Sequence, residues 1–260
     1  MKKFKAGVVQ FDVQKGQVQA NLDTILPYLK TLASEDVRLA ILPEMFSSSF
    51  DNENLIQHAK KTPDIIGQLC VFAKQNHMAI AGSLPEQENG QVFNTMIFID
   101  TDGMIKAKYK KLHLFRLTNE HHFYTAGDRI KIIDTSLGRA GLMICYDLRF
   151  PELSRSLFLQ GAQMILVSAQ WPSPRENHWQ ALVKARAIEN QLFVLGANRT
   201  GTDDSLAFPG MSTIVDPQGV VLSELGEKQG IGVADIDMEL LETTRASIPC
   251  MTDRRSDIYG

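Results

Sequence analysis

The sequence predicts an α/β fold in which two stacked β-sheets are flanked by helices. Apolar, β-branched-rich segments alternate with helical patterns along the chain. Several of these segments, such as residues 39–42 and 164–169, are almost uninterrupted apolar runs, which is typical of strands covered on both faces. About ten strands or more are expected, and this exceeds what one twisted open sheet holds comfortably. Two sheets are therefore favoured over one.

The strand pattern occurs in segments spread over the whole chain. They are residues 5–13, 37–45, 78–86, 94–112, 139–147, 162–170, 192–200, 211–225 and 230–238. Two segments contain a turn signal between strand-like flanks: Asp102-Gly103 in the fourth, and Pro217-Gln218-Gly219 in the eighth. Each of these two segments is expected to form a β-hairpin.

Helical patterns fall between the strands. They cover residues 21–35, 62–76, 151–162 and 177–191. The first has a helical stripe of leucine and isoleucine, with some strain from Pro27. The second is expected to begin with Thr62 as N-cap and Pro63 at the first helical position. The third opens on Pro151 and closes near Gly161.

Composition and charge narrow the class of protein. The 260 residues contain no proline-rich, glycine-serine or charged linker, so a single domain over residues 1–260 is expected. The formal net charge of -3 offers no basic field for nucleic acid. The N-terminal apolar stretch soon reaches charged residues, so neither a signal peptide nor a membrane span is expected. Cys70, Cys145 and Cys250 are an odd, scattered set, which indicates reduced thiols in a cytoplasmic protein.

Three polar residues stand at the carboxyl ends of predicted strands, where α/β sheets place their ligand crevices. They are Glu44, Lys111 and Cys145. A sharp turn between the strand before Cys145 and the helix at Pro151 could present the sulfur as in a nucleophile elbow. A carboxylate could take the thiol proton, while the ammonium and the backbone N–H of Tyr146 could donate to an oxyanion. This set is sufficient for acyl transfer through a thioester, without a metal or organic cofactor.

The segments around these residues resemble the nitrilase, or carbon–nitrogen hydrolase, superfamily over essentially the whole chain. The motifs are "LAILPEMF", "YKKLHLF", "GLMICYDLRFPEL", "WQALVKARAIENQLFVLGANRTG" and "DRRSDIY". The resemblance implies a four-layer αββα sandwich that dimerises through sheet-edge and helix packing. It also implies that Cys145 is the nucleophile, Glu44 the general base and Lys111 the oxyanion partner. Glu120 matches a second glutamate that positions the substrate and the lysine.

Other interpretations exist for each residue. A cysteine after an apolar strand is most often a buried small hydrophobe. Lys110 is adjacent to Lys111, but strand alternation places it on the opposite side. Four histidines could suggest a zinc site with Cys145, yet their spacing fits no standard ligand pattern, so no metal is expected. They are His113, His121, His122 and His178.

The substrate is expected to meet a cationic and aromatic wall. Arg149 could bind a substrate carboxylate through its guanidinium, or form a salt bridge with Asp147 or Glu152. Trp171 and Arg175 lie in a loop at the crevice side, where Trp171 could wall the pocket or belong to the core. With Tyr146 these residues form the expected substrate-binding set.

Within the superfamily, "HLFRLTNEHHFYTAG" and "AQWPSPR" look most like the omega-amidase branch. That resemblance implies release of ammonia from 2-oxoglutaramate or 2-oxosuccinamate. An amidase acting on deaminated glutathione shares "CYDLRFPELS" and is an alternative, as is an N-carbamoyl-amine hydrolase. Nitrile hydrolysis would use the same triad. A non-catalytic binding or scaffold protein on this fold would require loss of Glu44, Lys111 or Cys145, and all three are present.

Overall fold

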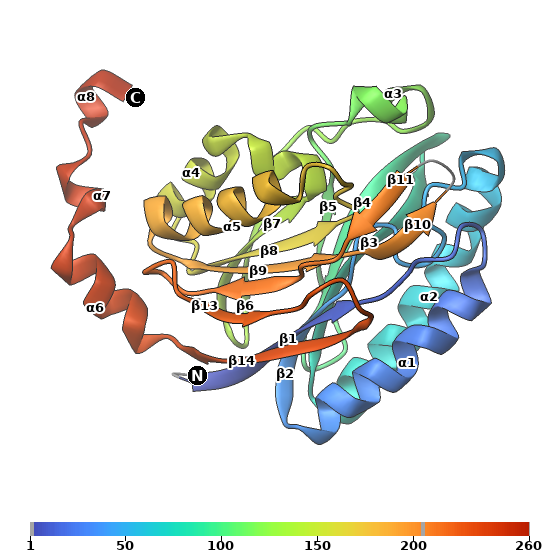
Figure 1. Ribbon diagram of the computed structural model, residues 1–260, viewed down its shortest axis with the longest axis horizontal. Helices are drawn as coiled ribbons and strands as arrows, with labels where there is room; N and C mark the ends of the chain where they lie inside the picture. Colours follow the sequence, from blue (N-terminus) through green and yellow to red (C-terminus); the bar gives the residue numbers. More distant parts are fainter. Residues whose placement is uncertain (1–2, 204–205, 260) are drawn as a thin grey trace.

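The computed structural model describes residues 3–203 and 206–259, and their strands form two six-stranded sheets and a two-stranded hairpin (Figure 1). The first sheet has the order β14 (Gly230–Asp237), β1 (Lys3–Gln10), β2 (Val37–Ile41), β3 (Ala79–Glu88), β4 (Gln91–Ile99) and β5 (Ile105–Lys110). The second has the order β13 (Val221–Glu224), β12 (Thr213–Val215), β9 (Phe193–Asn198), β8 (Met164–Ala169), β7 (Gly138–Ile144) and β6 (Ile132–Thr135). The hairpin pairs β10 (Thr200–Asp203) with β11 (Leu206–Pro209).

Both large sheets are mixed. In the first, β2 is parallel to β1 and β3, while β14, β4 and β5 add antiparallel neighbours. In the second, β8 is parallel to β7 and β9 at its centre. Parallel strands need crossover helices, and these cover the outer faces of both sheets.

The helices lie outside the two sheets (Figure 1). α1 (Val18–Ser34) and α2 (Leu55–Asn76) pack on the first sheet, whereas α4 (Pro151–Leu159) and α5 (Glu176–Asn190) cover the second. The chain ends in α6 (Glu239–Ser247), α7 (Cys250–Asp253) and α8 (Ser256–Tyr259), which lead away from the layered body. Shorter helical turns are η1 (Asn52–Asn54), η2 (Arg116–Thr118), α3 (Glu120–Phe123) and η3 (Cys145–Arg149).

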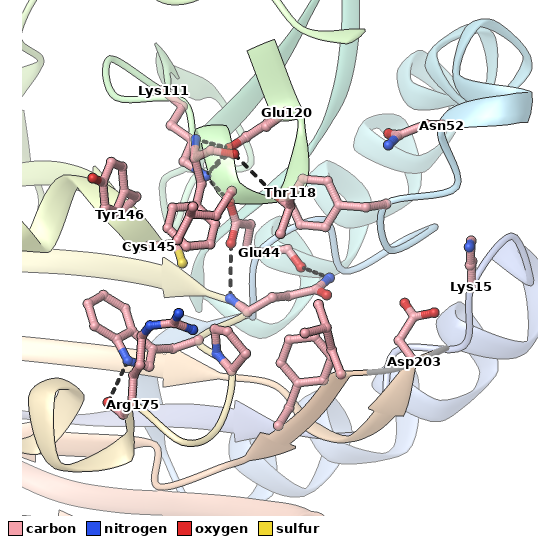
Figure 2. Close-up of a pocket in the computed structure, with 18 of the residues that line it drawn as sticks. Lys15, Glu44, Asn52, Lys111, Thr118, Glu120, Cys145, Tyr146, Arg175 and Asp203 are labelled. Carbon is pink, nitrogen blue, oxygen red and sulfur yellow. Dashed lines mark hydrogen bonds and ion pairs between the residues drawn. The ribbon is translucent and has the colours of Figure 1, made fainter. Parts of the chain in front are cut away.

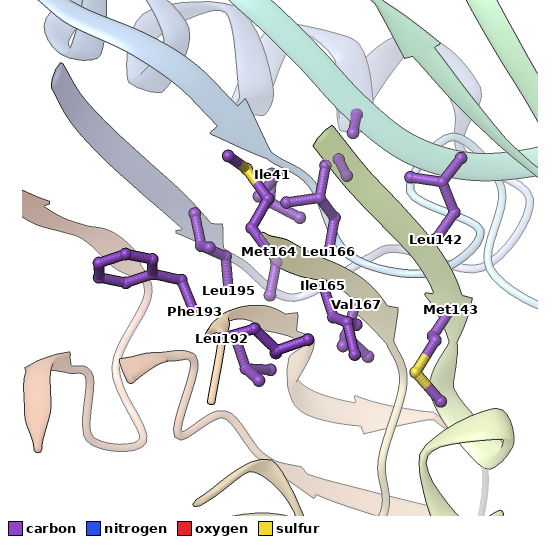
Figure 3. Packing of buried hydrophobic residues seen from close by; sticks show 14 of the residues in the cluster. Ile41, Leu142, Met143, Met164, Ile165, Leu166, Val167, Leu192, Phe193 and Leu195 are labelled. Carbon is purple, nitrogen blue, oxygen red and sulfur yellow. The ribbon is translucent and has the colours of Figure 1, made fainter. Parts of the chain in front are cut away.

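Side-chain alternation along the strands shows the layering. In β4, Met96 and Phe98 belong to the core between the sheets, whereas Ile97 and Ile99 belong to the core under α1 and α2. Since successive residues of a strand point to opposite faces, the first sheet is buried on both sides. Figure 3 shows Ile41 of β2 in the same packed layer as Leu166 of β8. The predicted αββα sandwich is confirmed.

Most predicted elements are found close to their expected positions. Both predicted hairpins form, β4 with β5 and β12 with β13. Gly103 and Gly219 have positive φ angles of 79° and 84° at the two turns, a conformation that glycine adopts without steric cost. Strands β6, β10 and β11 had no predicted counterpart.

The predicted start of α2 is wrong. The helix begins at Leu55, and Pro63 lies inside it. Thr62 is buried, and its hydroxyl donates to the carbonyl of Pro85 in β3 instead of capping a helix. The buried face that includes Leu55 and Ala59 extends the helix beyond the local proline signal, because packing of an apolar face supplies most helix stability in proteins. Within the described residues, no helix combines the length and the apolar character needed to cross a membrane.

Candidate active site

One pocket of about 380 Å³ opens where the carboxyl ends of β2, β5, β7 and β8 meet. It brings together residues from both sheets, so it exists only where the two sheets face each other. All eight residues singled out from the sequence line it. They are Glu44, Lys111, Glu120, Cys145, Tyr146, Arg149, Trp171 and Arg175. Figure 2 shows Glu44, Lys111, Glu120 and Cys145 gathered at one end, with Lys15 and Asp203 at the other.

Cys145 sits on the sharp turn that its sequence context predicts. It is the first residue of η3 directly after β7, and its φ angle is 45°. A left-handed conformation at a residue other than glycine costs on the order of 1–3 kcal/mol and persists only where surrounding contacts enforce it. The turn therefore presents the sulfur to the pocket at a cost that other contacts offset.

Asp147 supplies those contacts. Its side chain is fully buried, and its Oδ2 accepts hydrogen bonds from the Ile144 N–H at 2.9 Å and the Tyr109 hydroxyl at 2.7 Å. Its Oδ1 accepts the His113 N–H at 3.0 Å and lies 2.7 Å from His113 Nδ1. His113 thus binds the carboxylate of η3 and not a group of its own loop. The carboxylate ties the turn at Cys145 to β5 of the first sheet.

Three ionisable side chains form the buried end of the pocket. Lys111 Nζ lies 2.8 Å from Glu44 Oε1 and 2.8 Å from Glu120 Oε2. It also donates to Glu120 Oε1 at 3.0 Å. All three side chains are 1–2% exposed. A buried ammonium between two carboxylates forms a rigid unit, because removing any member would leave an uncompensated charge away from water.

Lys110 confirms the alternation expected of the strand. Its ammonium points away from the pocket, to Glu88 at 2.8 Å, and lies 3.8 Å from the centre of the Phe93 ring. The backbone N–H of Lys111 donates to the carbonyl of Asn94, which continues the β4–β5 pairing to this residue. Neighbouring lysines of one strand therefore have opposite surroundings.

Backbone groups hold the two carboxylates in place. Glu44 Oε2 accepts the Gln170 N–H at 3.0 Å, and the Gln170 side chain donates to the Glu44 carbonyl at 2.8 Å. Glu120 Oε2 accepts the Phe115 N–H at 2.7 Å. Because Gln170 follows β8, Glu44 of the first sheet is fixed by the end of a strand in the second.

The thiol and the nearest carboxylate are both protonated more readily than usual. Burial raises the pKa of Glu44, and the charge of Glu120 raises it further, against the lowering effect of Lys111. Burial also raises the pKa of Cys145 well above its ordinary value, and the Glu44 charge adds to this against the pull of Lys111. The ammonium of Lys111 favours a thiolate, but burial outweighs that effect, so the resting thiol is neutral.

Lys111 remains charged despite its burial. Burial alone would lower its pKa, but the charges of Glu120 and Glu44 raise it well above the usual range. An ammonium has three N–H donors. One is directed at Glu44 Oε1 and the other two at Oε1 and Oε2 of Glu120, so an oxyanion in the pocket would take over an N–H that a carboxylate now receives.

The pocket mouth carries the aromatic and cationic residues expected from the sequence. Trp171 is only 2% exposed, so it is both core and pocket wall, and its indole N–H donates to the Arg175 carbonyl at 2.8 Å. The guanidinium of Arg149 lies 4.7 Å from the centre of the Trp171 ring, and its Nη2 is 3.2 Å from His178 Nδ1. The Asp147 carboxylate is engaged by the turn, and Arg149 packs on Trp171 instead of forming the alternative salt bridge.

A buried arginine, Arg199, supports the opposite wall of the pocket. Arg199 Nη1 donates to Asp203 Oδ2 at 2.9 Å, to Ser49 at 2.9 Å and to Gln170 Oε1 at 3.0 Å. Its Nη2 donates to Asp12 Oδ1 at 3.0 Å. This network fixes Gln170, which in turn fixes Glu44, and it neutralises Asp203 at the pocket.

Sequence reasoning missed three residues of the site: Asn94, Gln170 and Arg199. Asn94 Nδ2 donates to Glu44 Oε1 at 2.8 Å and to Glu120 Oε1 at 3.3 Å. Gln170 follows β8 as Glu44 follows β2, so its position at a strand end was an available signal. Arg199 stands directly after the apolar strand β9, where a charged residue also needs a partner.

The described residues contain no group of three or more histidine, cysteine, aspartate or glutamate side chains placed to hold a metal ion. The carboxylates that could serve as ligands, those of Glu44 and Glu120, are already bound to Lys111. The chemistry that this donor set supports is attack by a thiol, proton transfer to a carboxylate and stabilisation of an oxyanion by an ammonium.

Comparison with known proteins gives a consistent set of relatives. A family model described as carbon-nitrogen hydrolase matches residues 5–246. The chain is 36% identical to 2-oxoglutaramate amidase from Bacillus subtilis (strain 168), over 99% of this chain and 100% of that protein. It is 31% identical to Omega-amidase NIT2 from Homo sapiens, over 100% of this chain and 98% of that protein.

Solved structures have the same arrangement of layers. XC1258 from Xanthomonas campestris, described as a CN-hydrolase superfamily protein with an arsenic adduct in the active site, matches with a TM-score of 0.92. The two chains are 32% identical, and the match covers 98% of each.

Proposed function

Because the chain belongs to the carbon–nitrogen hydrolase family, and is therefore an enzyme of that class, we propose that it is a cysteine-dependent amidase acting on a small carboxamide. The observation that carries the proposal is the buried Glu44–Lys111–Glu120 unit beside the neutral thiol of Cys145. The pocket supplies a nucleophile, a base and a cationic donor at one end, which are the parts that acyl transfer requires.

In the proposed first half-reaction, Glu44 takes the proton of the Cys145 thiol as the sulfur bonds to the amide carbon. The carbonyl π electrons move to oxygen, and the ammonium of Lys111 and the backbone N–H of Tyr146 stabilise the oxyanion. When the intermediate collapses, the carbon–nitrogen bond breaks, and the nitrogen leaves as ammonia with the proton from Glu44. A thioester on Cys145 remains.

Water completes the cycle. Glu44 takes a proton from water as its oxygen attacks the thioester carbon. The carbon–sulfur bond then breaks, the carboxylic acid leaves, and the proton returns from Glu44 to sulfur. The raised pKa of Glu44 supports this role, because a base whose pKa lies nearer neutrality can both accept and return a proton.

The substrate we propose is a short ω-amide with a carboxylate at its far end, such as 2-oxoglutaramate or 2-oxosuccinamate. Two similar proteins carry the names 2-oxoglutaramate amidase and omega-amidase. The pocket mouth supports this choice: Arg149 and Arg175 line it, and the carboxylate of Asp203 is paired with Arg199. Trp171 would wall the substrate chain, and Arg149 would bind its carboxylate through charge-assisted hydrogen bonds.

We also propose a homodimer in the cytoplasm. Support for self-association comes from exposed apolar side chains of the C-terminal segment, including Ile248 at 61% and Ile258 at 65%, and from the edge strand β13. Support for a reducing compartment comes from the three free cysteines. Sedimentation velocity would show a species of about twice the 29.0 kDa chain mass if the chain dimerises.

An ammonia-release screen with purified protein tests the substrate. The panel contains 2-oxoglutaramate, 2-oxosuccinamate, deaminated glutathione, an N-carbamoyl amine, a neutral amide of similar length and a nitrile. The keto-acid amides should have the highest kcat/KM, and the Cys145→Ala variant should release no ammonia from any of them. Preference for a neutral amide or a carbamoyl amine would overturn the substrate but leave the triad intact. Activity in Cys145→Ala would overturn the mechanism.

A further inference from the structure

Asn94 occupies a position in the buried cluster that the proposed mechanism does not yet use. It lies in β4 and is completely buried. Its side-chain amide nitrogen donates to Glu44 Oε1 at 2.8 Å and to Glu120 Oε1 at 3.3 Å. A neutral side chain therefore joins the same two carboxylates that share the Lys111 ammonium.

The orientation of this amide is determined by its surroundings. If oxygen and nitrogen were exchanged, the carbonyl oxygen would face two carboxylate oxygens without a proton between them. In the observed orientation, Asn94 Oδ1 is buried and has no hydrogen-bond partner among the described residues. An unsatisfied buried acceptor is unfavourable and requires an explanation. The two carboxylates explain it, because hydrogen bonds donated to two charged groups outweigh the cost of one neutral acceptor without a partner.

Counting acceptor sites distinguishes the two oxygens of Glu44. Each carboxylate oxygen has two lone-pair directions. Oε1 receives Lys111 Nζ at 2.8 Å and Asn94 Nδ2 at 2.8 Å, so both directions are filled. Oε2 receives the Gln170 N–H at 3.0 Å, which leaves one direction open. Of the two Glu44 oxygens, Oε2 is therefore the one with a lone-pair direction left for a proton from the Cys145 thiol.

Glu120 differs from Glu44 in this respect. Its Oε1 receives Lys111 and Asn94, and its Oε2 receives Lys111 and the Phe115 N–H. All four acceptor directions are filled, so no site remains for a substrate proton. Glu44 alone keeps a free direction.

We infer that Asn94 is a positioning residue which, together with Lys111, occupies Oε1 of Glu44 and so makes Oε2 the atom that takes the Cys145 proton. The inference rests on the proposed function of Glu44 as the base. Asn94 touches neither the substrate nor the sulfur in this scheme. It acts by holding the carboxylate in one rotation and by stabilising its charged form.

A pH profile detects this role. The ionisable groups that act on Glu44, or on which it acts, are Lys111, Glu120, Cys145 and Tyr124. The pKa values of Lys111, Cys145 and Tyr124 are raised well above their ordinary values, so we assign the acid limb of kcat/KM to Glu44, the proposed base, and to none of these three groups. Loss of a donor to a carboxylate disfavours its charged form. Removing the Asn94 amide should therefore move the acid limb to higher pH.

The first variant is Asn94→Leu, which keeps the volume and removes both donors. We expect the acid limb to move up by about one pH unit, since a hydrogen bond to a charged group is worth at least that much. Misplacement of the base should also lower kcat at neutral pH by up to about 100-fold, with little change in KM. A purely structural defect would instead lower activity by the same factor at every pH.

Thr95→Val is the matched control. Thr95 is the next residue of β4, is equally buried, points to the other face of the sheet, and has a hydroxyl without a partner among the described residues. Its pH profile should match that of the wild type. Asn94→Asp is the second variant, and its added carboxyl group should move the acid limb at least as far as Asn94→Leu does.

An unchanged acid limb in folded Asn94→Leu or Asn94→Asp would overturn the inference while leaving Glu44 as base. Failure of the proposed function would give a different result: Glu44→Gln or Cys145→Ala would remain active. The wild type gives a test that needs no folded Asn94 variant. In protein labelled with 15N-asparagine, one side-chain amide should titrate with the midpoint of the acid limb and lose that titration in Glu44→Gln. If no amide does so, the inference is wrong.

Discussion

The two ends of the pocket hold their charges in different ways. At the buried end, Glu44, Lys111 and Glu120 are 1–2% exposed and bind one another at 2.8–3.0 Å. At the mouth, Arg149 and Arg175 are half-buried, and Arg149 contacts the ring face of Trp171 and the imidazole of His178. The difference separates two tasks. A rigid, dry cluster suits chemistry common to all amides, and a partly hydrated cation suits selection among them.

The largest effect is expected when the sulfur of the Cys145 nucleophile is removed. Cys145→Ala should abolish turnover of every substrate, because no other thiol lines the pocket among the described residues. It should fold normally, since alanine loses only one buried atom and accepts the turn no worse than cysteine. Intact-mass analysis during turnover should detect an acyl adduct on the wild type.

Cys70→Ala is the control for this variant. Cys70 is half-buried in α2, away from the pocket, and burial raises the pKa of its thiol. The variant should keep its activity and its acyl adduct. An adduct that moved to Cys70 or Cys250 would contradict the assignment of the nucleophile.

The next largest effect is expected at the ammonium. Lys111→Ala removes an oxyanion donor, which typically costs ~100–1,000-fold in kcat. It also leaves two buried carboxylates without their cation, and breaking such a pair destabilises by ~3–5 kcal/mol. Steady-state kinetics should be combined with a measurement of Tm, so that kcat refers to the folded fraction.

Lys110→Ala is the control for Lys111→Ala, because the two lysines are adjacent in the chain but only Lys111 lines the active-site pocket. The Lys110 ammonium pairs with Glu88, whose side chain is half exposed, and surface ion pairs contribute only ~0–1 kcal/mol. Activity and Tm should both stay close to those of the wild type. Equal losses of activity in Lys110→Ala and Lys111→Ala would contradict a specific role of the Lys111 ammonium in the pocket.

A smaller and more selective effect is expected at the mouth. Arg149→Met keeps an apolar stem on Trp171 and removes the guanidinium. KM for 2-oxoglutaramate should rise by about tenfold, corresponding to ~1.4 kcal/mol, whereas KM for a neutral amide of similar length should change little. Arg175→Met, tested in parallel, identifies which arginine binds the carboxylate. A rise of equal size for acidic and neutral amides would remove the distinction between the two ends.

The smallest expected effect is that of a chelator. The proposed chemistry uses a thiol, a carboxylate and an ammonium, and none of these steps needs a Lewis acid. Prolonged dialysis against EDTA should leave kcat/KM unchanged for the keto-acid amides. Loss of activity that zinc restores would favour a metal site instead.

The layered fold was predictable because it depends on short-range patterns. Apolar runs identified the central strands, and glycine turns identified both hairpins. Pro63 misled the prediction of α2, since a local start signal was outweighed by burial of Leu55 and Ala59. The hairpin of β10 and β11 escaped notice because its strands have only four residues each.

The site was predictable only where residues precede or follow strands in recognisable motifs. All the expected lining residues reach one pocket. Asn94 was not foreseen, because an asparagine inside a strand gives no signal of its own. Its role depends on a register that sets it opposite Lys111, and on a loop from β2 that is distant in the sequence.

The attachment of Glu44 to the end of β8 has a consequence for how the chain gains its activity after synthesis or denaturation. Glu44 N–H donates to the Ala169 carbonyl, and Ser168 donates to the Leu42 carbonyl, so two strand ends far apart in the sequence are joined. Closing such long loops is slow relative to forming local turns and helices. During refolding, circular dichroism should therefore recover before ammonia release does. Enzyme activity would report the final docking of the two sheets, which is a later event than the formation of either one.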